Sequence, residues 1–105
     1  MTELSTAELE ALVEEATVDA YDEYEQRTGF HVMIEDNLAV PFQTTVLGFA
    51  VTVTGIDVLP GTGIAAICVS GGHRQAIGIL DLPLPDPRPA GAEWIDAYRH
   101  WEPSA

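Results

Sequence analysis

The sequence contains no lysine, a single cysteine and no long apolar run, and each of these absences excludes a class of protein. Its 105 residues include 17 acidic side chains and only four basic ones, all arginine, which gives a formal net charge of −13. Binding to nucleic acid or to an anionic membrane requires a positive surface. We therefore expect neither as a partner, and consider cations, basic proteins or simply water and salt instead.

The lone Cys68 cannot form a disulfide within the chain, which is typical of a reducing compartment. No stretch approaches the roughly 20 apolar residues that span a bilayer. The N-terminus lacks the basic and apolar segments of a secretory signal. We therefore expect a cytoplasmic protein.

The first 40 residues predict an acidic helical region. Ser5 and Glu8 fit a capping box, which starts a helix, and apolar residues then recur at steps of three and four. We expect this helix to reach about Thr28, because Gly29 follows as a residue free to adopt positive φ. A second, shorter helix is expected over residues 30–38.

Residues 42–82 change to a period of two and to the β-branched composition of half-buried strands. Gly48 is expected to form a kink or bulge that divides the first part of this region in two. Further strands are expected over residues 64–70 and 74–80, with turns at residues 60–63 and 71–72. Such short antiparallel strands predict a small, strongly bent, barrel-like sheet, with the N-terminal helix covering its open face.

The last quarter of the chain predicts a stiff connector and an aromatic helix. Prolines make residues 83–90 an extended connector, and Trp94, Tyr98 and Trp101 fall at helical spacing within residues 91–101. We expect these rings, and also Tyr21 and Tyr24, to be core and rim aromatics. The whole chain, residues 1–105, then forms one α+β domain in which acidic N-terminal helices pack on a small antiparallel sheet.

The negative charge is concentrated in the helical part. Residues 1–37 hold eleven carboxylates against Arg27 alone, a balance of −10, whereas residues 38–80 are neutral. On one continuous helix, Glu15, Asp19 and Asp22 would lie along a single edge and repel one another. An acidic face is ordinarily just solvated, and an acidic composition without lysine is also typical of adaptation to concentrated salt. Both interpretations stay open beside a specific cation site.

Glu35, Asp36 and Asn37 place two carboxylates and an amide at the end of the second expected helix. Calcium binds six to eight oxygens from carboxylates, amides, backbone carbonyls and water, and the end of a helix leaves carbonyls free. These residues therefore indicate a calcium site, provided that a turn brings them beside the acidic edge of the first helix. The EF-hand pattern matches nowhere in the sequence, so the ligands would come from separate segments.

Several segments resemble the small acidic calcium-binding proteins of the cyanobacterial CcbP type. They are residues 19–26 (DAYDEYEQ), 33–38 (MIEDNL), 41–42 (PF), 46–48 (VLG) and 93–101 (EWIDAYRHW). The resemblance covers nearly the whole chain. It implies a cytoplasmic calcium buffer or sensor without an EF-hand, on a compact fold of helices and sheet, and it carries over Asp36 as a metal ligand.

Two hypotheses for the function follow. The first is non-enzymatic calcium binding at surface carboxylates, with Asp36 as the main ligand, Glu35 and Asn37 in support, and Asp19, Asp22 or Glu23 contributing across the helix junction. The second is an acidic interaction module that binds a basic protein partner and has no specific metal site. An enzyme is not expected, because the sequence shows no convergent acid, base or nucleophile.

Overall fold

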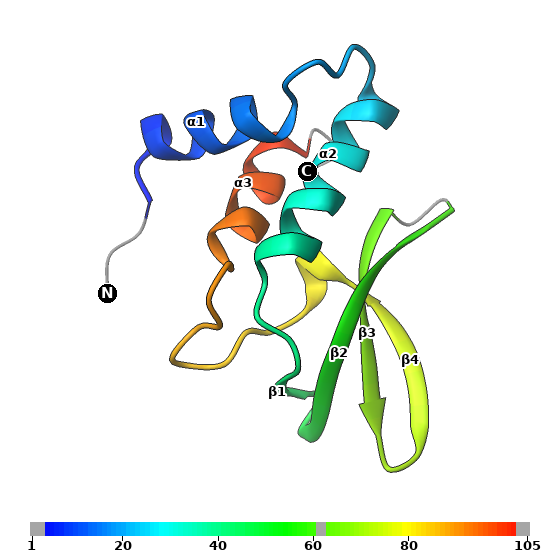
Figure 1. The fold of residues 1–105 in the computed structure, drawn as a ribbon. Coiled ribbons are helices and arrows are strands. Elements are labelled where there is room, and N and C mark those ends of the chain that lie inside the picture. Colours follow the sequence, from blue (N-terminus) through cyan, green and yellow to red (C-terminus); the bar gives the residue numbers. More distant parts are fainter. Residues whose placement is uncertain (1–3, 61–62, 103–105) are drawn as a thin grey trace.

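Three helices gather at one end of a curved four-stranded sheet in the computed structural model, which describes residues 4–60 and 63–102 (Figure 1). This arrangement confirms the expected α+β class. Part of the turn expected at residues 60–63 lies outside the described residues. The helices are α1 (Thr6–Ala16), α2 (Glu23–Asn37) and α3 (Glu93–Trp101), the strands are β1 (Phe42–Val46), β2 (Phe49–Leu59), β3 (Gly63–Ser70) and β4 (His73–Gly78), and a 3₁₀ turn, η1 (Ile79–Asp81), follows β4.

Helix α1 begins as predicted and ends earlier than predicted. The Ser5 hydroxyl accepts a hydrogen bond from the Glu8 backbone N–H at 3.1 Å, and the Glu8 carboxylate accepts one from the Ser5 N–H at 2.8 Å, so the capping box is confirmed. The single helix expected up to Thr28 is wrong, because α1 ends at Ala16. A new helix starts at Asp22, whose carboxylate accepts a hydrogen bond from the Glu25 N–H at 2.8 Å and so satisfies a donor that the helix start leaves unpaired.

Gly29 lies inside α2 and does not end a helix as expected. A Cβ atom at Gly29 would collide with the carbonyl oxygen of Ala16, so the backbones of α1 and α2 touch at this point. Glycine is therefore needed here for a close helix crossing and not for a positive φ.

Helix α2, not the N-terminal helix, covers the sheet. Its residues Phe30, Ile34 and Leu38 are buried at steps of four, and α2 contacts β2 and β3. Helix α1 packs instead on α3 and α2. The expectation that the first helix covers the sheet is therefore wrong, because the break after Ala16 turns the chain before its buried stripe reaches the strands.

The strands pair antiparallel in the order β1-β2-β3-β4. The turn expected at Gly71-Gly72 is confirmed, since Ser70 pairs with His73 across it. The division expected at Gly48 is also confirmed, but Gly48 belongs to a hairpin turn and not to a kink or bulge, since Val46 pairs with Phe49. The last strand ends at Gly78, before the predicted residue 80. The sheet is strongly curved in Figure 1 but open, because β1 and β4 are its two edges.

The C-terminal helix packs on the core as expected. The rings of Phe30, Tyr98 and Trp101 contact one another at centroid distances of 5.2 to 5.9 Å. Tyr21 and Tyr24, by contrast, are 86% and 75% exposed, so their assignment to core and rim is wrong. Tyr21 lies in the connection between α1 and α2, and Tyr24 lies in the first turn of α2.

The connector before α3 is held to the body by polar contacts. The Thr44 hydroxyl donates to the carbonyl of Pro83 at 2.6 Å, and Arg88 forms an ion pair with Asp96 at 2.8 Å. Among the described helices, none combines the length and the apolar character that a membrane crossing requires.

Candidate metal site

The candidate ligands lie at opposite ends of α2. Asp22 and Glu23 stand at its first turn, whereas Glu35, Asp36 and Asn37 form its last turn. With a rise of about 1.5 Å per residue, Asp22 and Asp36 are about 21 Å apart along the helix axis, while the ligands of one calcium ion lie within about 2.6 Å of the ion. The single site expected across the helix junction is therefore wrong, because one straight helix separates its two halves.

The carboxylates at the start of α2 already have partners within the fold. Asp22 caps the helix, Glu25 accepts a hydrogen bond from the Tyr21 N–H at 3.0 Å, and Glu23 pairs with Arg27 at 3.3 Å. Asp19 lies in the preceding connection with φ 62°. The start of a helix also carries the positive end of the helix dipole, which disfavours a bound cation.

The end of α2 has the opposite electrostatics. A helix C-terminus carries a partial negative charge and unpaired carbonyl oxygens, and here the exposed carboxylates of Glu35 and Asp36 add to it. The last turn contains no basic residue. One turn earlier, the His31 Nε2 lies 4.0 Å from the Glu35 carboxylate. A cation placed at the end of α2 would relieve the repulsion between these carboxylates and the negative end of the helix dipole.

Neighbouring contacts fix the last turn of α2 in place. The Asn37 amide nitrogen donates to the Met33 carbonyl at 2.8 Å, which leaves its amide oxygen as the atom that a cation would contact. The backbone of Gly91, at φ 90°, presses so closely on this turn that a Cβ there would collide with the Asn37 carbonyl oxygen. Leu38, the C-cap, is buried, and the Ala39 N–H donates to the Ala90 carbonyl at 2.8 Å.

The donor set at this end suits calcium and does not suit a transition metal. Within residues 4–60 and 63–102 no group of three or more His, Cys, Asp or Glu side chains could hold a metal ion. A site at the end of α2 would therefore combine two carboxylates with an amide oxygen, backbone carbonyls and water. Calcium accepts such a mixed set of hard oxygens.

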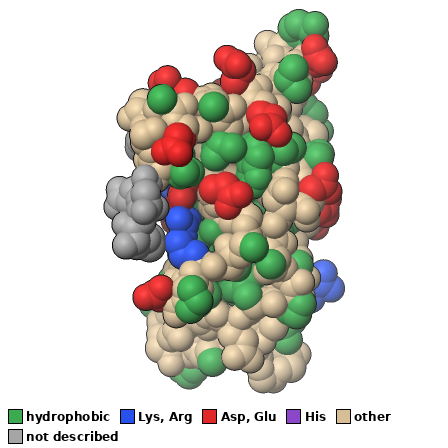
Figure 2. Space-filling view, turned by 60° about the vertical axis from the view of Figure 1, so that its left-hand side comes forward, with side chains coloured by type: hydrophobic (Ala, Val, Ile, Leu, Met, Phe, Trp, Pro, Cys, Tyr) green, Lys and Arg blue, Asp and Glu red, His purple; other side chains and the backbone are tan. Residues whose placement is uncertain are grey.

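The acidic surface matches this picture. Figure 2 shows acidic side chains over the helical part of this face and few of them over the sheet part below. The uneven distribution of acidic residues along the sequence is thus also visible on this face of the structure.

Arg27 is a structural residue whose role the sequence did not reveal. Its guanidinium donates to the Tyr98 hydroxyl at 3.3 Å and to the Glu102 carboxylate at 3.1 Å, and it lies 5.2 Å from the Trp101 ring centroid. Burial alone would lower the pKa of Arg27, but its hydrogen bonds to Tyr98 and Glu102 outweigh burial and raise the pKa above its ordinary value. Partners more than 70 residues away leave no local pattern that could have indicated them.

Comparison with known proteins identifies a family. The family model of the CcbP type, described as calcium binding, matches residues 10–58. This segment includes most of α1, all of α2, β1 and most of β2, and therefore all six candidate ligands. No curated protein and no solved structure matches the chain.

Proposed function

We propose that this chain, which belongs to the CcbP-type calcium-binding family, binds calcium at the C-terminal end of α2 and acts as a non-enzymatic cytoplasmic calcium buffer. Asp36 is the main ligand, and Glu35 and Asn37 support it. Asp22 and Glu23 at the start of α2, and Asp19 just before it, lie too far from the last turn of α2 to bind the same ion. They contribute to the negative field that attracts cations to this part of the molecule.

One observation carries the proposal. Two exposed carboxylates and an amide occupy the last turn of α2, at the negative end of the helix dipole, and that turn contains no basic residue. Carboxylates at the negative end of a helix dipole destabilise that helix end. A divalent cation bound to these carboxylates replaces the repulsion with attraction, so calcium binding should increase the stability of the protein.

The geometry favours a buffer over a sensor. The last turn of α2 is already formed, and Leu38 and Gly91 hold it against the body of the protein. Binding at such a turn changes charge more than shape, whereas a sensor needs a second conformation that calcium favours. We therefore expect no exposure of apolar surface when calcium binds.

Calorimetry and thermal unfolding at low salt test the proposal. Calcium should stabilise the wild-type chain by mass action, by about 2.7 kcal/mol when its concentration is 100 times the Kd. The substitution Asp36→Asn keeps the shape of the side chain and removes its charge, so it should weaken calcium binding by about tenfold or more, which is a loss of about 1.4 kcal/mol.

Asp57→Asn is the matched control. Asp57 is an exposed aspartate of β2, and its substitution changes the net charge by the same amount. Calcium binding should remain near the wild-type level in this variant. If melting curves of the wild-type chain with and without millimolar calcium coincide, or if both variants lose binding equally, the site at the end of α2 is wrong.

A second candidate function, binding of a basic protein, is favoured by the surface between α1 and α2. Val18, Tyr21 and Tyr24 are exposed there, and a shallow hollow of about 320 Å³ includes Val18 and Tyr24 together with the carboxylates of Asp19 and Glu25. Apolar surface rimmed by acidic groups suits a basic amphipathic segment. Asp36→Asn separates the two functions, since it should abolish the calcium signal and leave capture of a basic peptide intact.

A further inference from the structure

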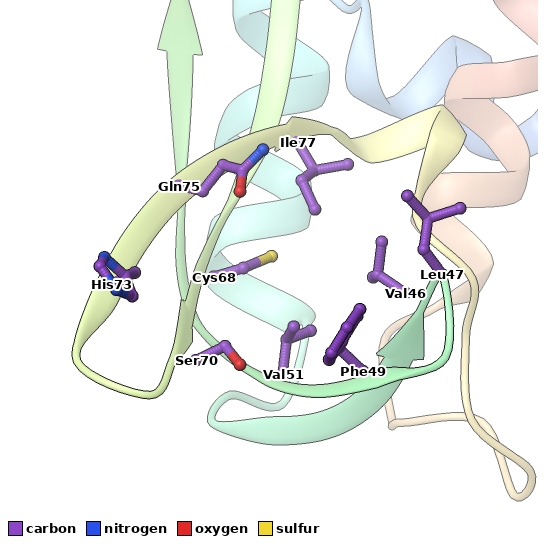
Figure 3. Close-up of a pocket in the computed structure, with 9 residues that line it drawn as sticks. All are labelled: Val46, Leu47, Phe49, Val51, Cys68, Ser70, His73, Gln75 and Ile77. Carbon is purple, nitrogen blue, oxygen red and sulfur yellow. The ribbon is translucent and has the colours of Figure 1, made fainter.

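A hollow of about 370 Å³ lies on the inner face of the sheet, at the end away from the helices (Figure 3). Residues of all four strands line it, including Val46 of β1, Val51 of β2, Cys68 of β3 and Gln75 of β4. Strands β1 and β4 are opposite edges of the sheet, so its curvature is what brings them around a common space. The hollow continues the buried inner face beyond the part that α2 covers.

The two sides of the hollow differ in polarity. In Figure 3, Ser70, His73 and Gln75 lie on one side, and the apolar residues of the β1–β2 hairpin lie on the other. The apolar side could contact the apolar part of a bound molecule, and the polar side has donors for hydrogen bonds to a polar group at the end of that molecule.

The lining is also unusual in its charge. None of the lining residues is acidic, in a chain with 17 acidic residues, and His73 is the one lining residue that can carry positive charge. Residues 38–80, which form the sheet, have no net charge. An anion is therefore repelled less here than at the helical end, so this is the place where an anionic group is best accommodated.

The hairpin beside the hollow breaks a local rule of turn formation. Leu47 and Gly48 connect β1 to β2 and have φ values of 50° and 82°, a turn that strongly prefers Asn-Gly or Asp-Gly. Leu47 is nevertheless leucine, and it is 92% exposed, while Phe49 is 72% exposed. A leucine in such a turn, together with exposed apolar side chains beside it, is typical of a surface used for binding.

Cys68 forms part of the floor and does not act as a nucleophile there. Its side chain is 2% exposed, and its thiol lies 3.7 Å from the Ala66 carbonyl. Burial raises the pKa of the Cys68 thiol, which keeps it protonated and unreactive. It therefore serves as an apolar surface that a bound molecule would cover.

We propose that this hollow binds a small amphipathic anion, with an apolar chain against Val46, Phe49 and Ile77 and a carboxylate beside His73 and Gln75. At roughly 30 Å³ for each non-hydrogen atom, the liquid volume of a water molecule, the 370 Å³ space holds about twelve such atoms. That is the size of a medium-chain fatty acid. The site does not involve α2, so it is independent of the calcium site.

Titration with decanoate in calcium-free buffer, followed by amide NMR shifts, tests the proposal. We expect saturable shifts confined to residues that line the hollow. Decanol, which has the same chain without the charge, should bind more weakly than decanoate.

Two variants and a control make the test specific. His73→Glu should weaken decanoate binding about tenfold and leave decanol binding nearly unchanged, whereas the same substitution at the exposed His100 of α3 should affect neither. Leu47→Asn suits the turn better, so it should raise the melting temperature while weakening binding of both ligands.

Three results would overturn the proposal. One is the absence of shifts in the hollow at millimolar decanoate. Another is equal loss of decanoate binding in His73→Glu and His100→Glu. The third is concentration-dependent dimerisation, seen by analytical ultracentrifugation, that shifts the same residues without any ligand and shows that a second copy covers the hollow. Because the buffer contains no calcium, failure here leaves the proposed calcium site untouched.

Discussion

Gly29 sets the distance between two helices through the side chain that it lacks. A Cβ atom at this position would collide with the carbonyl oxygen of Ala16. Backbone atoms of α1 and α2 are therefore in contact, and neither neighbour is a flexible side chain that could move aside. A single residue thus fixes how the acidic N-terminal helix lies on the rest of the molecule.

Gly29→Ala should lower the free energy of unfolding by about 2 kcal/mol, because overpacking at a close contact costs about 1–3 kcal/mol and exceeds the helix propensity that alanine gains. Urea unfolding measures the change. Gly55→Ala is the control, since a Cβ at Gly55 meets no atom within 4 Å. Equal stability of the Gly29 variant and the wild-type chain would show that α1 and α2 are free to separate.

Helix α2 organises the molecule at the scale of its elements. One face buries Phe30 and Ile34 against the sheet, its last turn carries the proposed calcium ligands, and Arg27 links it to α3. The two ends of α2 carry partial charges of opposite sign because of the helix dipole. Its acidic residues therefore have different roles: those at the start cap the helix, and those at the end are suited to hold a cation.

Arg27→Met should destabilise the fold by about 2 kcal/mol, because it leaves the hydroxyl of Tyr98 and the carboxylate of Glu102 without this charged partner. Urea unfolding followed by tryptophan fluorescence measures the loss, since Trp101 stacks beside the guanidinium. Arg74→Met removes the same charge from an exposed position of β4 and should have little effect. If both variants lost equal stability, general charge balance and not the link between helices would be responsible.

Over the whole molecule, negative charge is separated from neutral surface. Residues 1–37, which include α1 and α2, have a net charge of −10, whereas residues 38–80, which include the strands, have no net charge. Repulsion within the helical part opposes folding and acts over about 10 Å at 0.1 M salt. The same unevenness separates the two proposed ligands, since the cation site lies on an acidic helix end and the anion site lies within the neutral sheet.

Raising the ionic strength from low salt to 0.5 M should stabilise the chain by about 1 kcal/mol, which is about 4–8 °C in melting temperature for a domain of this size. Sodium chloride and choline chloride should have the same effect if screening is the cause. A gain in sodium chloride alone would indicate specific adaptation to salt, and no gain in either would show that the repulsion is too small to matter.

Features that depend on near neighbours in the chain were predictable. Ser5 and Glu8 form their capping box, Gly48 and Gly71-Gly72 form their turns, and the aromatic residues of α3 pack on the core. Glu35, Asp36 and Asn37 lie at a helix end as expected. Each of these outcomes depends on periodicity, a cap or a turn within about four residues, for which the sequence holds the whole cause.

Patterns within the sequence are enough to predict the α+β class, the uneven charge and the position of Asp36 at the end of a helix. Three-dimensional packing was needed to learn that Gly29 meets Ala16, that Arg27 meets Tyr98, and that the two groups of candidate ligands lie at opposite ends of α2. It also decided that β1 and β4 line one hollow. The reason is physical: these contacts join residues that are distant along the chain, and packing brings them together, whereas local propensity acts only between neighbours.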